Sequence, residues 1–389
     1  MQYPRRFEAL PDYAFPRLRA LLDQHEPGGP VLHMSIGEPR HDPPTFLAEA
    51  LSGAMAEFGR YPVNDGTPAL KAAISDWLQR RYGVAVDADT QILPLNGTRE
   101  GLFNAAVALC PEDGPVVLTP NPFYQVYAVA ALAMGGQPVY VPATRETGFL
   151  PDYTALPDDV LNRTAIAYIC SPSNPQGAVA DRGYWRDLIA LAEKHDFRIF
   201  ADECYSEVYR GTPPVGAMEV AAEMGADPER VVIFHSLSKR SNLPGLRSGF
   251  AAGGPKSMAR LKQLRNYAGA PLPGPIQAVS ALAWADEAHV DASRARYATK
   301  FEIADEILGD VPGYIPPEAG FFLWLPVEDG EAAVLKLWQE TGIRALPGAY
   351  LSREVDGENP GAGFVRVALV ASEDEVKQGL GQLRTCLYG

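Results

Sequence analysis

The sequence predicts an α/β protein with two domains: a large domain whose mostly parallel sheet is sandwiched by helices, and a smaller α+β domain. Two observations carry this prediction. Short apolar segments rich in β-branched residues alternate with helical patterns between residues 91 and 235, as in sheets whose parallel strands are joined by helices. The chain has 389 residues, which is enough for two sizeable cores.

The large domain is expected at residues 46–270, after an arm at 1–45 that also contributes to the small domain. The arm leads into a helix within 3–23 and then into a short strand at 31–39, which breaks at Gly37. Helices at 46–58 and 68–82 come next. Strands are then predicted at 91–95, 115–119, 137–141, 165–170, 197–201, 231–235 and 248–252, with helices at 100–109, 122–134, 184–195 and 259–267.

A proline-rich break at 270–275 leads into the small domain, which is expected at 271–389. A helical run at 276–308 comes first, followed by a strand at 320–325, a helix at 331–341 and a strand at 364–369. Because these strands and helices do not alternate strictly, they are typical of an α+β domain.

Composition and charge argue against several function classes. The net charge of −14 disfavours nucleic acid and anionic membranes as partners, so anionic ligands need locally placed Arg and Lys. The four cysteines form no C-x-x-C pair and the six histidines no H-E-x-x-H motif, which predicts reduced cysteines and no metal site. No apolar segment suits a signal peptide or a membrane span, so we expect a cytoplasmic protein.

The stretch from residue 231 to residue 250 carries the clearest chemistry. An apolar strand ends in Ser236, Ser238 and Lys239, and a Pro-Gly turn precedes Arg247. Two hydroxyls and an Arg around one tight loop suit a doubly charged phosphate, because Arg offers paired donors. Lys239 lies where a carbonyl of the same ligand could meet its amine as a Schiff base.

Two other interpretations of this stretch stay open. An isolated S-x-S-K is often a solvated surface loop. Ser236-Leu237-Ser238-Lys239 also satisfies S-x-x-K, the serine-nucleophile motif of penicillin-recognising enzymes. That motif needs Ser and Lys on one helical turn together with S-D-N and K-T-G, and neither tripeptide occurs in the sequence. The strand before the motif and the Pro-Gly after it argue against such a helix.

Polar and aromatic residues also follow the other strands, at the edge where ligands bind in parallel sheets. Gly97, Thr98 and Arg99 open a helix whose free backbone N–H groups favour an anion, although many helices begin in this way. Tyr124, or Phe123 beside it, could stack on a planar ring, and the commoner alternative is a packed core aromatic.

Three more positions complete the candidate site. Asn174 presents its amide from the stiff turn Pro-x-Asn-Pro-x-Gly. Asp202 ends an apolar strand, where a carboxylate is costly to bury unless it is paired, as with a protonated ring nitrogen; the alternative is a helix N-cap. Tyr205 lies three residues further on. Arg366 is flanked by apolar residues in a strand and should pair with a planar carboxylate, either of a substrate or of a structural Asp or Glu.

The pattern Ser-x-Ser-Lys-x-x-x-x-Pro-Gly-x-Arg, from Ser236 to Arg247, resembles the cofactor-lysine signature of pyridoxal-phosphate (PLP) aminotransferases of the aspartate aminotransferase superfamily, fold type I. The other motifs occur in family order on successive strand ends. The resemblance implies PLP as cofactor and transamination as activity, with catalytic roles for Lys239, Asp202 and Tyr205. It implies a cofactor site made of Gly97, Thr98, Arg99, Tyr124, Asn174, Asp202, Tyr205, Ser236, Ser238, Lys239 and Arg247.

The same resemblance implies contacts with substrate and with a second subunit. Arg366 is expected to grip the substrate α-carboxylate, with Gly37 and Asn174 beside it. Tyr61 lies in a loop similar to the family loop whose Tyr reaches the cofactor phosphate of the neighbouring subunit. We therefore expect a homodimer that acts on small amino acids and 2-oxo acids.

The fuller sequence SLSKRSNLPGLRSGF is most similar to N-succinyldiaminopimelate aminotransferases. This similarity implies N-succinyl-LL-2,6-diaminopimelate as amino donor and 2-oxoglutarate as acceptor, within lysine and diaminopimelate biosynthesis. Transamination of aspartate, alanine or acetylornithine, and a PLP-dependent lyase reaction, are alternatives on the same fold. A serine hydrolase and a non-catalytic PLP sensor are alternatives from other classes.

Overall fold

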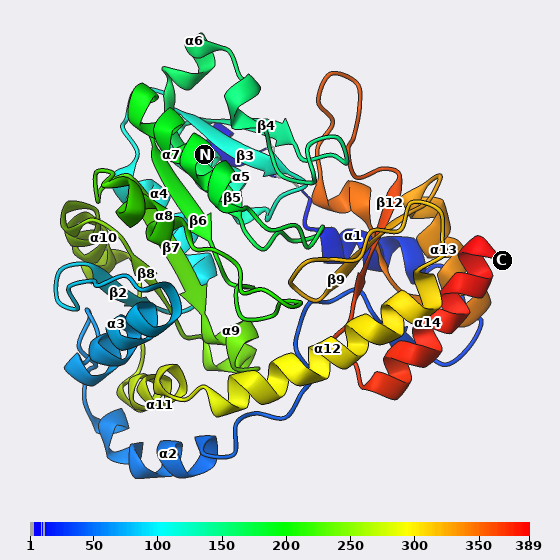
Figure 1. The fold of residues 1–389 in the computed structure, drawn as a ribbon, viewed down its shortest axis with the longest axis horizontal. Helices are drawn as coiled ribbons and strands as arrows, with labels where there is room; N and C mark the ends of the chain where they lie inside the picture. Colours follow the sequence, from blue (N-terminus) through cyan, green and yellow to red (C-terminus); the bar gives the residue numbers. More distant parts are fainter. Residues whose placement is uncertain (1–3, 9, 11) are drawn as a thin grey trace.

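The computed structural model describes residues 4–8, 10 and 12–389. A seven-stranded sheet in the order β2-β8-β7-β6-β5-β3-β4 forms the centre of the large domain (Figure 1). Neighbouring strands from β7 to β4 pair in parallel, and β8 runs antiparallel to both β2 and β7. The strands are β2 (Ile92–Leu95), β3 (Val116–Asn121), β4 (Gln137–Pro142), β5 (Thr164–Cys170), β6 (Arg198–Asp202), β7 (Val231–Ser236) and β8 (Gly249–Ala252).

The predicted fold class is confirmed, and each predicted strand of this sheet begins and ends within two residues of the observed one. The central strands β3, β5 and β7 are buried along their whole length, because helices cover both faces of the sheet. The helices of this part are α2 (Leu47–Gly53), α3 (Pro68–Tyr82), α4 (Thr98–Leu109), α5 (Val126–Ala133), α6 (Asp158–Leu161), α7 (Arg182–His195), α8 (Ala217–Met224), α9 (Leu237–Arg240), α10 (Pro255–Ala268) and α11 (Gly274–Ala285).

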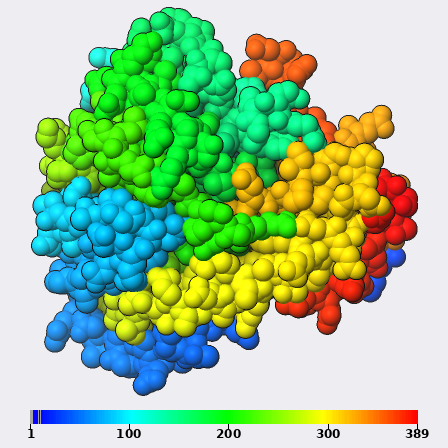
Figure 2. All heavy atoms as spheres, viewed as in Figure 1, coloured from blue at the N-terminus to red at the C-terminus, as the bar shows by residue number. Residues whose placement is uncertain are grey.

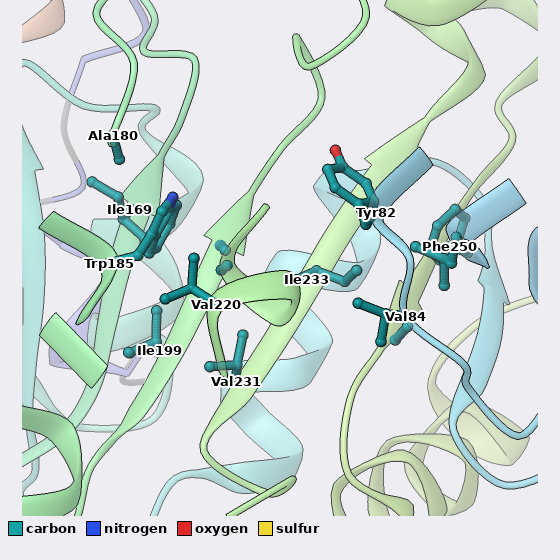
Figure 3. Close-up of a cluster of buried hydrophobic side chains, with 14 of the residues drawn as sticks. Tyr82, Val84, Ile169, Ala180, Trp185, Ile199, Val220, Val231, Ile233 and Phe250 are labelled. Carbon is teal, nitrogen blue, oxygen red and sulfur yellow. The ribbon is translucent and has the colours of Figure 1, made fainter. Parts of the chain in front are cut away.

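Alternate side chains of each strand enter two separate hydrophobic cores. On one face, Ile169, Ile233 and Phe250 share a core with Trp185 of α7 and with Tyr82 at the end of α3, and Figure 3 shows Ile169 beside Trp185. On the other face, residues of β6 and β7 pack with α4, α5 and α10. Because buried side chains pack against both faces of the sheet, the carboxyl ends of the parallel strands are held in place at one edge.

The small domain contains two short sheets and its own core. Its strands are β1 (Leu32–His33) paired with β10 (Ile343–Arg344), and the antiparallel set β11 (Leu346–Pro347), β12 (Phe364–Ala368) and β9 (Phe322–Pro326). Its helices are α1 (Ala14–Leu22), α12 (Ala288–Leu308), α13 (Gly330–Thr341) and α14 (Glu373–Tyr388), and short 3₁₀ turns η1 (Arg5–Phe7), η2 (Met55–Gly59), η3 (Tyr153–Ala155), η4 (Pro244–Leu246) and η5 (Gly348–Leu351) complete the chain.

The predicted helical run at 276–308 consists of two helices, α11 and α12, separated by Asp286 and Glu287. We call these two residues the joint. Helix α11 packs on α3 of the large domain, whereas α12 packs on α14 of the small domain. Figure 2 shows both helices as a yellow surface that crosses the visible face toward the red C-terminal helix. Trp284 of α11 belongs to the core on one face of the large sheet. The domain boundary expected at residue 271 stays a prediction.

Helix α14 is absent from the sequence prediction, although it carries a start signal. Ser372 and Glu375 form a capping box, in which each side chain accepts a hydrogen bond from the other residue's backbone N–H. The helix then buries one side of its surface in the small-domain core. Within the described residues, no helix combines the length and the apolar character that crossing a bilayer requires.

Candidate active site

A cavity of about 430 Å³ opens at the carboxyl edge of the large sheet, where the small domain meets it. Strand ends of the large domain, the segment after β1 and strands β9 and β12 supply its walls. Twelve of the predicted site residues line this one cavity: Gly37, Thr98, Arg99, Tyr124, Asn174, Asp202, Tyr205, Ser236, Ser238, Lys239, Arg247 and Arg366. The structure thus brings together residues from seven separate stretches of the chain.

Lys239 lies on α9, a single helical turn that begins directly after β7. The sequence-based prediction against a helical turn here is therefore wrong, whereas the expectation that no long helix follows the strand agrees with the four-residue α9. The Ser236 hydroxyl caps the turn by accepting a hydrogen bond from Ser238 N. Lys239 Nζ donates to the carbonyl of Gly37. Burial lowers the pKa of Lys239 to about 8, and the charges of Arg366 and Arg247 act in the same direction.

This geometry does not support a serine nucleophile at Ser236. Its hydroxyl oxygen lies 2.9 Å from Ser238 Oγ and 3.3 Å from the carbonyl oxygen of Ser248. The Lys239 amine, which would have to act as its base, is hydrogen-bonded to Gly37 instead. The S-x-x-K match follows from local spacing alone.

An anion cradle forms where the loop after β2 meets the loop after α9. Gly97 has φ +83°, and a Cβ at this position would lie 2.3 Å from Nη2 of Arg247, so the close approach of the two requires glycine. Thr98 then begins α4, whose first backbone N–H groups have no partner within the helix. With the hydroxyls of Ser236 and Ser238 in the same cavity, the cradle suits a phosphate dianion.

Asp202 ends β6 and is only 5 % exposed. Tyr127 on α5 donates a 2.7 Å hydrogen bond to Asp202 Oδ2, and Oδ1 lies 3.4 Å from the backbone nitrogen of Cys204. Burial raises the pKa of Asp202. A turn rather than a helix follows Asp202, so the N-cap alternative is not observed. A buried carboxylate of this kind is suited to hold a protonated ring nitrogen.

Arg366 reaches the cavity from strand β12 of the small domain. Its guanidinium donates to Asn174 Oδ1 at 2.8 Å and to the carbonyl of Ser35 at 2.7 Å, and it lies 4.2 Å from the ring centroid of Phe322. Burial lowers its pKa to about 10. No Asp or Glu in the described chain pairs with it, so the structural salt bridge considered from the sequence is not observed, and the buried Nε has no partner.

The aromatic wall contains both candidates for a stacking residue. Phe123 is 2 % exposed and belongs to a hydrophobic core, whereas Tyr124 is half-buried. The Tyr124 hydroxyl accepts a 2.6 Å hydrogen bond from Arg99 Nε, and Nη2 of Arg99 lies 3.5 Å from the hydroxyl of Tyr13. Tyr124 remains the better candidate for stacking, because Phe123 is committed to the core.

Of three further predicted residues, Tyr205 lines the cavity, whereas Gly97 and Tyr61 do not. Tyr205 is buried against Phe321 and Phe322, and burial raises its pKa. Gly97 contacts Arg247 without lining the cavity itself. Tyr61 is fully exposed and lies outside the cavity lining, so its predicted role in a neighbouring subunit stays a prediction.

Sequence reasoning missed four contributors: the Tyr127 hydroxyl, the Ser35 carbonyl, the Phe322 ring and Tyr13 of the N-terminal arm. Each enters through tertiary packing, and none lies in a motif. Only the position of Tyr127 in a predicted helix beside the stacking residue offered a local signal.

The donor set fits PLP. The cradle suits a phosphate, the buried Asp202 carboxylate suits a protonated pyridine nitrogen, and Asn174 and Tyr205 lie in the same cavity as candidate partners of the ring oxygen. Lys239 supplies an amine whose pKa of about 8 leaves an appreciable neutral fraction near neutral pH. Among the described residues, no group of three or more His, Cys, Asp or Glu side chains could hold a metal ion.

Comparisons with known proteins agree with this site. The family model described as aminotransferase class I and II matches residues 29–383. An LL-diaminopimelate aminotransferase of Dehalococcoides mccartyi (strain ATCC BAA-2266 / KCTC 15142 / 195) is 31% identical over 395 residues, covering 98% of each chain.

Solved structures are similar along the whole chain. An aminotransferase from Neisseria meningitidis Z2491 superposes with a TM-score of 0.94 at 38% identity, covering 98% of this chain and 99% of that one. A probable N-succinyldiaminopimelate aminotransferase from Thermus thermophilus gives a TM-score of 0.86 at 26% identity, covering 96% and 100%. With a fold, a cavity and a family match that agree, the chain belongs to the class I and II aminotransferases, and PLP is its cofactor.

Proposed function

We propose that this protein transfers the amino group of a diaminopimelate-type amino acid to 2-oxoglutarate, with N-succinyl-LL-2,6-diaminopimelate as the donor. The observation that carries the proposal is that the cavity containing Lys239 holds two further arginines, Arg366 and Arg99, besides Arg247 of the phosphate cradle. A donor of this type bears an α-carboxylate at the reacting end and at least one more at the distal end, two in the succinyl donor. Anions of this kind need locally placed cations in a protein of net charge −14.

Each residue then has a separate task. Arg366 binds the α-carboxylate, and Asn174 holds the guanidinium in place through their 2.8 Å hydrogen bond. Lys239 holds the cofactor and moves the proton at the substrate Cα, because its pKa of about 8 suits a general base. Asp202 keeps the ring nitrogen protonated. When bound, PLP supplies an electron sink for the pair left at that carbon.

Arg99 supports the distal part of the proposal. The hydroxyls of Tyr124 and Tyr13 hold its side chain, and no carboxylate in the described chain pairs with it. A guanidinium fixed by two neutral partners keeps its charge available for a ligand. We propose that Arg99 binds the distal carboxylate, in addition to the predicted role of its backbone in the phosphate cradle.

LL-Diaminopimelate is the second candidate donor, because curated relatives along the whole chain carry the name LL-diaminopimelate aminotransferase. This donor has a distal ammonium where the other has a succinyl amide, so a site for it needs a carboxylate beside Arg99. Glu38, whose side chain is exposed, lines the same cavity and is the candidate for that carboxylate.

A substrate panel tests the proposal. The purified protein is assayed with 2-oxoglutarate and one of N-succinyl-LL-diaminopimelate, LL-diaminopimelate, aspartate, alanine, acetylornithine or an aromatic amino acid. We expect kcat/KM to be highest for the succinyl donor. If LL-diaminopimelate leads, the second candidate replaces the first, and if aromatic amino acids or alanine far outperform both, the diaminopimelate assignment is wrong. Release of ammonia without a 2-oxo acid would identify a lyase.

We also propose a homodimer in the cytoplasm. Tyr61 is fully exposed, and the exposed apolar residues Met55, Phe58 and Val63 surround it in sequence. All four cysteines are unpaired, as expected in a reducing compartment. If Tyr61 completes the partner's site, mixing an inactive Tyr61 variant with an inactive Lys239 variant should restore part of the activity, because one of the two sites in a mixed dimer is intact. No recovery after mixing and refolding would contradict this.

A further inference from the structure

The three residues directly after Lys239 are tied to the joint between α11 and α12. Arg240, Ser241 and Asn242 do not line the cavity, and each of them is at most 8 % exposed. Their hydrogen bonds instead reach the end of α11, the joint itself and the first turns of α12. These contacts therefore connect the lysine turn to the helices that follow it, not to the ligand cavity.

Arg240 closes the end of α11. Its Nη1 donates to the carbonyl of Ala283 at 2.6 Å, and its Nη2 donates to the Asp286 carbonyl at 3.3 Å and the Glu287 carboxylate at 2.9 Å. The guanidinium also lies 5.0 Å from the ring centroid of Trp284, as in a cation–π contact. Carbonyls at a helix C-terminus have no partner within the helix, so one arginine both satisfies them and fixes the joint.

Ser241 adds a second connection through His289. Ser241 Oγ lies 2.8 Å from His289 Nε2, and Nδ1 of the same ring lies 2.5 Å from Asp286 Oδ2. When Nδ1–H donates a hydrogen bond to Asp286, Nε2 is free to accept a hydrogen bond from the Ser241 hydroxyl. The order Ser-His-Asp is that of a hydrolase triad, but Ser241 is 0 % exposed, so a substrate could not reach it. The arrangement therefore serves as a structural connection.

Asn242 adds a third connection, one turn further along α12. It adopts a left-handed conformation with φ +54°, which Asn tolerates better than most residues. Its Nδ2 donates to Ser293 Oγ at 3.2 Å. The lysine turn is thus attached to both sides of the joint by three consecutive side chains.

The joint connects the helix packed on the large domain, which carries Lys239, to the helix packed on the small domain, which carries Arg366. Helix α11 packs on the large domain, which carries Lys239, and Figure 1 shows α12 running from the region of α9 to the small domain. Phe301 and Leu308 of α12 enter the small-domain core, to which strand β12 and its Arg366 belong. We propose that Arg240, Ser241 and Asn242 are positioning residues that hold the Lys239 turn against the joint. They thereby fix the position of the Lys239 amine relative to Arg366.

This inference rests on the proposed function of Lys239, and its test has a readout that does not depend on the loaded enzyme. Ser241→Ala and His289→Gln each break the bridge from Ser241 through His289 to Asp286, since Gln has no group in place of Nδ1. Arg240→Lys keeps the charge but not the paired donors, and Ser257→Ala is the matched control. Ser257 lies on α10, away from the lysine turn, and is 1 % exposed. Its hydroxyl donates a 2.7 Å hydrogen bond to the Glu229 carboxylate. The measurements are kcat and KM with PLP bound, Tm, and the pH dependence of Lys239 labelling by trinitrobenzenesulfonate in the PLP-free protein, read by peptide mass.

We expect Ser241→Ala and His289→Gln to lower kcat about tenfold with little change in KM, because displacing a catalytic group by about 1 Å costs up to ~10²-fold. The double variant should lose no more than the worse single variant, since both remove one contact. In the PLP-free protein, the pKa at which Lys239 reacts should rise from about 8 toward its ordinary 10.5, because a loosened turn admits water. Ser257→Ala should resemble the wild type in every measurement.

The inference is overturned if both variants keep the wild-type kcat and the wild-type pH dependence of Lys239 labelling, or if Ser257→Ala causes the same changes. If Ser241→Ala lowers Tm markedly, His289→Gln decides the question, because Gln keeps a polar side chain of similar length at a position that is 11% exposed. Failure of the proposed function gives a different pattern: the wild type itself would not transaminate, or borohydride would not fix PLP to Lys239, whereas labelling of the PLP-free variants would still report on the clamp.

Discussion

Asn174 and Arg366 belong to different domains and meet in a hydrogen bond of 2.8 Å, in which the guanidinium donates to the amide oxygen. Asn174 stands in a turn after β5 of the large sheet, and Arg366 stands on β12 of the small one. The bond therefore crosses the domain boundary at the place where the substrate α-carboxylate should bind.

Replacing Arg366 by Lys should raise KM for the amino donor roughly 10- to 100-fold, because one ammonium cannot present the paired donors that are worth ~1.5–3 kcal/mol against a charged group. PLP binding should persist, since no part of the phosphate cradle changes. Steady-state kinetics and a PLP titration measure the two effects. An unchanged KM would remove Arg366 from the proposed role.

Replacing Arg99 by Gln should separate donors by their distal end. We expect KM for N-succinyl-LL-diaminopimelate to rise about tenfold or more, as the loss of a charged hydrogen bond implies, while KM for alanine stays the same. Tyr13→Phe is the matched control, because it removes only the 3.5 Å contact to Nη2 and should have a smaller effect. An equal rise for both donors would place Arg99 in the cofactor site alone.

Lys239→Met should abolish transamination and yet stabilise the PLP-free protein at neutral pH. Burial lowers the pKa of Lys239 to about 8 in the folded state, below the ordinary 10.5. Below pH 8 the folded protein must keep the buried amine charged, at a cost of roughly 3 kcal/mol. From about pH 8 to 10.5 the unfolded chain binds the extra proton, so the stability of the wild type rises with pH, and above that window the cost is gone.

The measurement is the difference in the free energy of unfolding between Lys239→Met and the wild type, from urea titrations at pH 7 and pH 10. We expect the difference to favour the variant at pH 7 and to shrink at pH 10. Lys377→Met, at an exposed position of α14, should change stability at neither pH. A difference that is constant with pH would mean that Lys239 is not held in a desolvated site.

Glu203 and His235 should matter for stability rather than for chemistry. Both are 2 % exposed, and Oε2 of Glu203 lies 3.1 Å from Nε2 of His235. Removing the imidazole with His235→Ala should lower the free energy of unfolding by about 2–5 kcal/mol, because it leaves a cavity between Trp77 and Phe250 and removes a polar neighbour of the buried Glu203. Glu331→Ala breaks the ion pair of Glu331 with Arg17, in which each side chain is 45% exposed, and should lower the free energy of unfolding by ~0–1 kcal/mol. Urea titrations compare the two, and equal losses would contradict the argument.

The sequence was informative wherever local pattern and burial agree. The strands of the large sheet are buried on both faces and read as continuous apolar runs, and the residues that follow Leu95, Cys170, Ala201 and His235 all reach the same edge. Parallel pairing makes that convergence a consequence of topology, which is why the sequence predicts that the separated motifs form one site.

The remaining features depend on tertiary contacts that have no sequence period. Nothing in the sequence indicates that the Tyr127 hydroxyl reaches Asp202, that the Ser35 carbonyl accepts from Arg366, or that Tyr13 of the arm approaches Arg99. The single turn of α9 was missed because one helical turn leaves too little periodicity to detect. The separation of α11 from α12 was missed because both helices continue the same apolar pattern across the joint.

The antiparallel pairing of β7 with β8 places Ser236 opposite Gly249, so the ladder pins both ends of the loop that carries Lys239 and Arg247. A one-residue insertion or deletion there would have to be absorbed inside the loop, or it would turn the strand side chains to the opposite faces of the sheet. Proteins that inherit this scaffold should therefore exchange side chains in the loop more readily than they change its length. Changes of substrate should accumulate in side chains such as Tyr13 and Arg99, which line the cavity from outside this loop.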